Sequence, residues 1–250
     1  MMLARHTPGV PRAGTTVDRA SGKIKGYFGK ATGNPMSPKA YIDPGGTGGY
    51  PGQRRCRSVG EPAIGTRKWT RLEYERLVEA EILGPGDRIE LLGGEMIVKE
   101  PQHSPHATAI RLTARALRRV FGDGWDVSVQ LPVALDAESE PEPDVSVVQG
   151  DPRDYRDAHP QRPVLVVEVS LSRVAFDREH KGSLYARAGI TDYWIVNIPA
   201  RRVEVYREPV GDGAAPFGWR YVSVTTLGPG ETISPLALPV ARIPIADLLP

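Results

Sequence analysis

The sequence contains a single cysteine, Cys56, so it can form neither an intramolecular disulfide nor a cysteine-based zinc site. It also lacks any apolar run close to the roughly 18 residues that a membrane span requires. Its first residues, Met1 to Arg12, have no apolar segment of the kind found in secretory signals. These absences predict a cytoplasmic protein. The content of 40% hydrophobic and 25% charged residues suits a soluble globular fold.

Residues 1–66 are rich in glycine, proline and basic residues and show no sustained apolar period. They hold ten Lys and Arg against three Asp and Glu, a formal charge of +7, whereas residues 67–250 hold 22 against 27, or −5. Such a segment cannot bury enough apolar surface to offset its chain entropy, which predicts a disordered basic extension. It is either an arm that binds nucleic acid or an extension without function, and we favour the second. Residues 67–250 then form the folded domain, whose acidic charge argues against strong, sequence-independent duplex binding.

Two helices are predicted at the start of this domain. The first follows Thr70, which forms a capping-box pattern with Glu73, and we expect it to end near Gly84. Apolar residues repeat along it: Leu72, Leu77, Val78 and Ile82. The second helix starts at Ser104, the expected N-cap, with Pro105 in the first helical position. Four arginines lie largely on the polar face of this second helix: Arg111, Arg115, Arg118 and Arg119. That face is either solvated or contacts phosphate, and we favour solvation.

The remaining elements predict an α/β domain. Strands are expected at 89–92 and 95–98, joined by a Gly93-Gly94 turn, and at 127–135, 145–148, 164–170, 193–198, 203–206 and 219–224. The strand–helix–strand order across 163–198 implies a right-handed crossover within a central mixed sheet. Residues 243–249 are expected to form a short closing helix.

Two carboxylates stand out within the predicted sheet. Asp144 precedes the apolar run 145–148, and Glu168 lies between Val167 and Val169. Continuous apolar runs are typical of strands covered on both faces, where an unpaired carboxylate costs several kcal/mol. Asp144 and Glu168 therefore need a cation, and a bound metal ion is the simplest candidate. A solvated or turn-capping acid is the alternative for Asp144 alone.

The order of these acids, with Lys181 downstream, resembles the PD-(D/E)XK nuclease superfamily. More closely, the chain resembles the Uma family of restriction endonucleases over about residues 69–208. Four segments carry the resemblance: Arg88–Glu95, Ser104-Pro105-His106, Pro143-Asp144-Val145, and Val166–Ser170 continuing through Asp177–Lys181 to Tyr193–Val196.

The resemblance implies a restriction-endonuclease-like fold and metal-dependent hydrolysis of phosphodiester bonds in DNA. It implies that Asp144 and Glu168 hold Mg²⁺ or Mn²⁺, that Glu90 joins them as a third carboxylate, and that the Val169 carbonyl adds an oxygen ligand. The oxygen ligands favour these hard cations over zinc. A homodimer would suit an enzyme that cuts duplex DNA with one active site per chain.

One departure from the superfamily concerns its lysine. The usual position, two residues after the strand carboxylate, is Ser170 here, which cannot supply the charge. Lys181 is the best substitute, because we expect a helix starting near Asp177 to pack back onto the sheet. The alternative is a surface ion pair between Asp177 and Lys181 at i,i+4 spacing. Arg178 is the next cation to consider.

Three further side chains are candidates for secondary roles. His106 follows Ser-Pro near a helix N-terminus, and this position should lower its pKa and favour the neutral form. A contact with substrate or with a ligand of the site is one interpretation of its role. A zinc site with His103 is not expected, because the helix starts between the two histidines. Gln130 points either into the site or into the core as a hydrogen-bonded amide.

Two other classes of protein compete with the nuclease. The first is a non-catalytic nucleic-acid-binding or scaffold protein on the same fold, since fold does not determine function. The second is a serine hydrolase that uses Ser170 or Ser172 with His106 or His180. Neither serine stands in a Gly-x-Ser-x-Gly elbow, so we disfavour this class.

Overall fold

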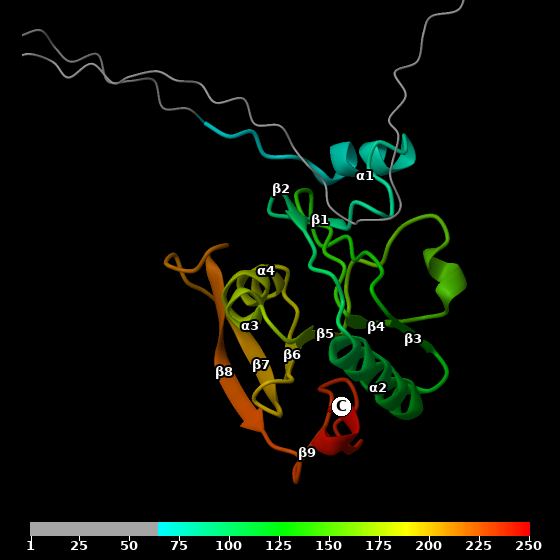
Figure 1. Cartoon of the computed structure of the whole chain (residues 1–250), viewed down its shortest axis with the longest axis vertical. Coiled ribbons are helices and arrows are strands. Elements are labelled where there is room, and N and C mark those ends of the chain that lie inside the picture. Colours follow the sequence, from blue (N-terminus) through cyan, green and yellow to red (C-terminus); the bar gives the residue numbers. More distant parts are fainter. Residues whose placement is uncertain (1–64) are drawn as a thin grey trace, which may run out of the picture. The chain divides into compact units, whose positions relative to one another are not determined.

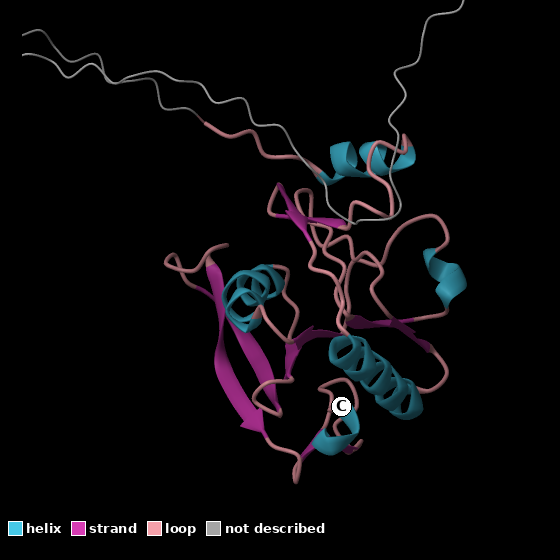
Figure 2. Ribbon diagram, viewed as in Figure 1, coloured by secondary structure: helices cyan, strands magenta, loops and turns pink. Residues whose placement is uncertain are grey.

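The computed structural model describes residues 65–250, in which helices lie on both sides of a central sheet (Figures 1 and 2). The predicted extension at 1–66 lies outside the described residues apart from its last two. In chain order the elements are α1 (Arg71–Glu79), β1 (Ile89–Leu92), β2 (Glu95–Val98), α2 (Ser104–Phe121), β3 (Trp125–Ser128), β4 (Val145–Gln149), a 3₁₀ turn η1 (Pro152–Tyr155), β5 (Leu165–Ser170), α3 (Val174–Phe176), a π-helical turn η2 (Asp177–Lys181), α4 (Gly182–Arg187), β6 (Asp192–Asn197), β7 (Arg202–Gly211), β8 (Trp219–Leu227), β9 (Thr232–Ile233), β10 (Ile243–Pro244) and a 3₁₀ turn η3 (Ile245–Leu248).

The central sheet has the strand order β3-β4-β5-β6-β7-β8. Among the strands of residues 65–250, only β5 and β6 pair in parallel, because the helical segment from Val174 to Arg187 returns the chain to the end of the sheet at which β5 began. The other pairs are antiparallel, so the expected mixed sheet is confirmed. Every residue of β5 and β6 is buried, as their continuous apolar sequences predict.

Alternate residues of β5 face two separate hydrophobic clusters. Val167 and Val169 pack in the larger cluster with α2 and η3, whereas Val166 packs with Tyr185 of α4. Glu168, which has the same parity as Val166, therefore projects toward the α4 side of the sheet. Asp144 lies opposite Glu168, because Val145 of β4 pairs with Val167 of the antiparallel strand β5.

Several predicted element boundaries were wrong. The strand expected at 127–135 ends at Ser128, because Gln130 adopts a left-handed backbone (φ 52°) and Pro132 cannot donate to a ladder. His103 rather than Ser104 is the N-cap of α2, with Pro105 still in the first turn. The short closing helix expected over residues 243–249 forms as the 3₁₀ helix η3 and is confined to Ile245–Leu248, because Ile243 and Pro244 belong to the short strand β10.

The first helix forms, but it ends at Glu79 rather than near Gly84 and does not bury the predicted face. Its capping box between Thr70 and Glu73 is present. Leu72, Val78 and Ile82 are nevertheless exposed, and Tyr74 is the buried residue of α1, donating to the Ile89 carbonyl at 2.7 Å. Within residues 65–250, no helix combines the length and apolarity needed to cross a membrane.

Candidate active site

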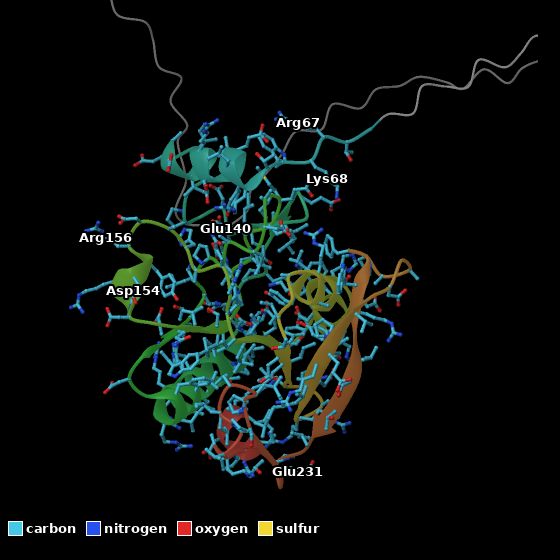
Figure 3. The ribbon with its side chains drawn as sticks, turned by 180° about the vertical axis from the view of Figure 1, so that it is seen from behind. Arg67, Lys68, Glu140, Asp154, Arg156 and Glu231 are labelled. Atoms are coloured by element: carbon cyan, nitrogen blue, oxygen red, sulfur yellow. The ribbon has the colours of Figure 1, made fainter. Side chains whose placement is uncertain are left out.

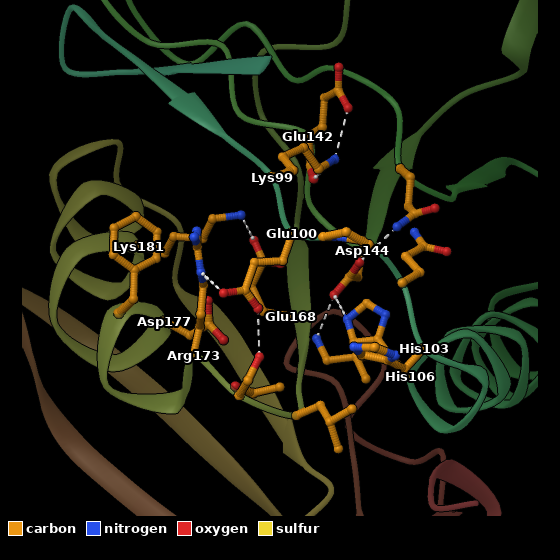
Figure 4. A pocket seen from close by; sticks show the side chains of 18 of the residues that line it. Lys99, Glu100, His103, His106, Glu142, Asp144, Glu168, Arg173, Asp177 and Lys181 are labelled. Carbon is orange, nitrogen blue, oxygen red and sulfur yellow. Dashed lines mark hydrogen bonds and ion pairs between the residues drawn. The ribbon is translucent and has the colours of Figure 1, made fainter. Parts of the chain in front are cut away.

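The predicted site residues line one pocket, with a cavity of about 100 Å³, on the α4 side of β5 (Figure 4). Strand β1, the start of α2, the C-terminal end of β5 and the helical turns α3 and η2 reach it, and Asp144 joins them from the position just before β4. Four buried carboxylates and one buried lysine belong to its wall: Glu90, Asp144, Glu168, Asp177 and Lys181. Negative charge therefore exceeds positive charge among the buried groups.

Asp144 is held by donors on three sides. Its Oδ2 accepts the Val169 backbone N–H at 2.8 Å and lies 3.3 Å from His106 Nε2, while Oδ1 accepts Gln130 Nε2 at 3.0 Å. Burial raises the pKa of Asp144, but the contacts with His106 and Val169 outweigh it and hold this pKa below its usual value. Asp144 is therefore an oriented anion, and Gln130 points into the site rather than into the core.

Glu168 and Glu90 share one cation. Lys181 Nζ lies 3.0 Å from Glu168 Oε1 and 3.1 Å from Glu90 Oε1. Tyr185 donates to the same Glu168 oxygen at 2.7 Å, and the Glu142 backbone N–H donates to Glu90 Oε2 at 3.1 Å. Burial raises the pKa of Glu168 to about 7 despite the nearby Lys181 charge. Burial lowers the pKa of Lys181, but the charges of Glu168 and Glu90 outweigh it and raise that pKa.

The surface ion pair considered for Lys181 is wrong. Its ammonium is buried and its ion-pair partners within residues 65–250 are Glu168 and Glu90, not Asp177. Arg178 instead forms a bidentate ion pair with Glu204 of β7, in which Nη2 lies 2.6 Å from Oε1 and Nε lies 2.8 Å from Oε2. Lys181 is thus the cation that reaches the strand carboxylates, and its catalytic role stays a prediction.

A π-helical turn sets the position of Lys181. The Gly182 backbone N–H reaches back to the Asp177 carbonyl, and the Tyr193 hydroxyl donates to that same carbonyl at 2.9 Å. The helical segment also starts earlier than predicted, at Val174. Wide turns of this kind are rare and frequently lie at functional sites.

Two residues of the site were missed in the sequence. Asp177 lies in the pocket wall, where burial raises its pKa to about 6 although Lys181 lowers it. Tyr185 is four residues after Lys181 and donates to Glu168. Helical spacing could have found both, because Asp177 and Tyr185 are four residues before and after Lys181.

The prediction of a neutral His106 was wrong in direction. Burial lowers its pKa, but the hydrogen bond and charge of Asp144 outweigh burial and raise this pKa above the usual value. Its Nδ1 is buried and has no hydrogen-bond partner among residues 65–250. Asp144, rather than the nearby helix N-terminus, therefore sets the direction in which the pKa of His106 shifts.

The serine hydrolase interpretation gains no support from the geometry. Ser170 Oγ is buried without a partner in the described part of the chain. Ser172 donates to Glu100 at 2.6 Å. Neither hydroxyl is hydrogen-bonded to a histidine there, so no activated nucleophile is formed.

The mixed sheet and the carboxylate–lysine pocket at the ends of β4 and β5 define a protein with a nuclease-type α/β fold. A family model for Uma2, described as "Putative restriction endonuclease", matches residues 72–246, and the chain belongs to this family. Among solved structures, the chain is similar to a protein from Anabaena variabilis described as a putative nuclease belonging to DUF820. That similarity has a TM-score of 0.54 and 16% identity, and it covers 72% of this chain and 96% of the other. No curated protein matches the sequence.

Proposed function

We propose that this protein hydrolyses phosphodiester bonds in DNA and uses Mg²⁺ or Mn²⁺. The observation that carries the proposal is the position of Lys181. Its ammonium lies 3.0 Å from Glu168, although Ser170 occupies the usual lysine position on the strand. The family description and the similarity to a nuclease fold support the same reaction.

The carboxylate oxygens of the pocket are donors of the type that a hard divalent cation prefers. Mg²⁺ needs only one or two protein carboxylates, because water and substrate phosphate complete its coordination. Both hydrogen bonds to Glu168 use Oε1, and within residues 65–250 no hydrogen bond uses Oε2. Asp144 and Glu168 would be the main ligands, with Glu90 and the Val169 carbonyl as further oxygens. A bound cation would polarise the phosphate and lower the pKa of a water molecule.

The chain's own residues would supply positioning and charge. Lys181 would stabilise the charge that builds on the phosphate or orient the attacking water. Gln130 and the Val169 N–H would keep the Asp144 carboxylate in one orientation. Tyr185 would restrain Glu168 through its hydrogen bond. Side chains held in this way lose little freedom when substrate binds.

A non-catalytic nucleic-acid-binding protein is the second candidate, and one observation favours it. Among the residues that the structure describes, no group of three or more His, Cys, Asp or Glu side chains is arranged to hold a metal ion. Lys181 partly neutralises the carboxylates and would compete with a cation.

Incubation of the protein with plasmid DNA and single-stranded DNA tests the two candidates. Parallel reactions contain Mg²⁺, Mn²⁺ or EDTA, and Asp144→Asn serves as the control for a contaminating nuclease. Cutting that requires the metal ion and disappears in the variant supports the nuclease. A mobility shift of intact DNA without metal-dependent cutting supports the binding protein instead.

A further inference from the structure

A larger cleft adjoins the candidate active site. Its cavity measures about 830 Å³ and lies between α1, the turn before β1 and the segment after β3. Most of its apolar wall comes from six residues: Val78, Leu83, Pro85, Ile89, Leu131 and Pro132. Val78 and Leu131 are 46% and 55% exposed, which is high for large hydrophobic side chains. A concave apolar wall with a few polar groups is typical of a site for an organic ligand.

The cleft is continuous with the catalytic pocket. Five residues line both: Arg88, Lys99, Gln102, Gln130 and Glu142. Lys99 Nζ and Glu142 Oε2 form an ion pair at 2.8 Å at this junction (Figure 4). Gln130 bonds to Asp144 through Nε2, and no hydrogen bond within residues 65–250 uses its Oε1. A group bound in the cleft would therefore lie next to a group bound at Asp144.

The charges of the cleft favour a neutral group over a phosphate. Its only cations among the described lining residues, Arg88 and Lys99, both lie at the junction with the catalytic pocket. Glu81 and Asp87 line the part away from the junction. The wall continues past Tyr74 into a further acidic cavity, which is lined in part by Glu140 (labelled in Figure 3). Phosphates would be attracted to the junction and repelled beyond it.

We propose that this cleft binds an unpaired nucleobase adjacent to the scissile phosphate, so the substrate class is single-stranded or bulged DNA rather than continuous duplex. The inference rests on the proposed nuclease function and names its substrate. The base would contact Val78 and Leu131, while Arg88 and Lys99 would contact the phosphate that links it to the reacting one. A base in continuous duplex must first leave the stack, which costs free energy that a bulge or single strand avoids.

The test compares three fluorescein-labelled DNAs of one sequence: a single strand, a perfect duplex, and a duplex with one bulged 2-aminopurine. Affinity is measured in Ca²⁺ by anisotropy, and insertion of the base is followed by 2-aminopurine fluorescence. Cutting is measured separately in Mg²⁺ and Mn²⁺. We expect the single strand and the bulged duplex to bind at least about tenfold more tightly than the perfect duplex.

Two matched double variants locate the binding site. Val78→Ala with Leu131→Ala removes the exposed apolar contacts of the cleft, and Val222→Ala with Val224→Ala removes similarly exposed side chains of β8, at 46% and 53% exposure. The cleft variant should lose about tenfold in affinity for the unpaired substrates, on the scale of the apolar surface removed. The β8 variant should lose none. Thermal melting checks that both remain folded.

The outcomes separate the cleft assignment from the nuclease proposal. Equal binding of perfect and bulged duplex, unchanged binding by the cleft variant, or no binding of any DNA would overturn the cleft assignment. Tight binding of the bulged duplex that the cleft variant weakens, without metal-dependent cutting, would support the cleft and overturn the nuclease.

Discussion

Lys181 is buried between two carboxylates whose charges it cannot balance alone. Removing a lysine from water costs several kcal/mol, which the contacts with Glu168 and Glu90 must offset. Asp144 and Asp177 add further negative charge to the same pocket. Burial is the largest cause that raises the pKa of Glu168 to about 7, and the negative charges of Asp144, Asp177 and Glu90 raise it further against the lowering effect of Lys181. A divalent cation would relieve this repulsion.

Replacing a proposed ligand by its amide should remove the metal ion and keep the fold. We expect Asp144→Asn and Glu168→Gln each to abolish cutting, because each change removes a ligand charge at nearly constant shape. Calorimetry should show weakened Mn²⁺ and Mg²⁺ affinity, and thermal melting serves as the control for folding. Unchanged affinity in both variants would contradict the ligand assignment.

Replacing the lysine should separate its role from that of the ligands. Lys181→Met should lower turnover by roughly a hundredfold or more, the usual scale for one electrostatic catalyst, without lowering metal affinity. Lys181→Arg retains the charge on a wider group and should recover part of the activity. Single-turnover cutting at saturating metal ion measures both. Full activity in Lys181→Met would remove Lys181 from the mechanism.

Metal binding should depend on pH through the Glu168 carboxyl. Burial raises its pKa to about 7, so the carboxyl is increasingly protonated below that pH and ionised above it. A cation binds the ionised form and displaces the proton, so affinity should fall by up to about tenfold per pH unit below 7 and level off above it. Calorimetry in buffers of different ionisation enthalpy measures the released proton. Glu168→Gln should abolish this component, and an unchanged pH profile in that variant would contradict the assignment.

At the scale of elements, an ion pair between Arg178 and Glu204 connects η2 to strand β7 of the sheet. Glu204 of β7 accepts hydrogen bonds from Arg178, Asn197 and Tyr206. Burial raises the pKa of Glu204, but these donors outweigh it and lower the pKa to about 2. Because Arg178 precedes Lys181 by three residues within η2, this contact helps to hold the lysine in place.

The Glu204 contact predicts a pH-dependent stability. Its pKa is about 2 in the folded state and 4.5 as the ordinary value, so its contribution is fully present above 4.5 and is lost as pH falls toward 2. Glu204→Gln should reduce the free energy of unfolding by about 1–2 kcal/mol at neutral pH, allowing for the exposure of Arg178 to water. Urea unfolding at several pH values measures the difference, which should shrink below pH 4.5. A constant difference would assign the loss to packing rather than charge.

At the scale of the whole domain, the sequence predicted which helices and strands form better than it predicted the residues at which they end. Apolar runs and the Gly93-Gly94 turn identified the strands of the site correctly, and the order of Asp144, Glu168 and Lys181 placed all three in one pocket. The early end of β3 and the π turn could not be predicted from the sequence. Gln130 is held by hydrogen bonds with Pro143 and Asp144, and the Asp177 carbonyl accepts a hydrogen bond from Tyr193. In both cases the partner residues are distant in the chain.

The exposed apolar face of α1 is another feature that the sequence alone does not predict. Its helical period predicts a helix but does not identify what lies against the apolar residues. The hydrophobic core is closed by α2, α4 and the C-terminal turn η3, and α1 contributes Tyr74 through its contact with β1. Val78 is thereby left in the wall of the cleft.

Residues 1–66 should contribute nothing to the thermal stability of the folded domain. Both hydrophobic clusters are formed within residues 109–249, so we expect a chain that begins at Arg67 to melt at the same temperature as the full chain. Removing residues 1–66 also removes a formal charge of +7 and leaves −5. If the extension has no function, cutting and DNA affinity should be unchanged at every salt concentration. A large loss of melting temperature would contradict independent folding. A lower affinity with a weaker salt dependence would instead identify the extension as a phosphate-binding arm, because fewer counterions are released on binding.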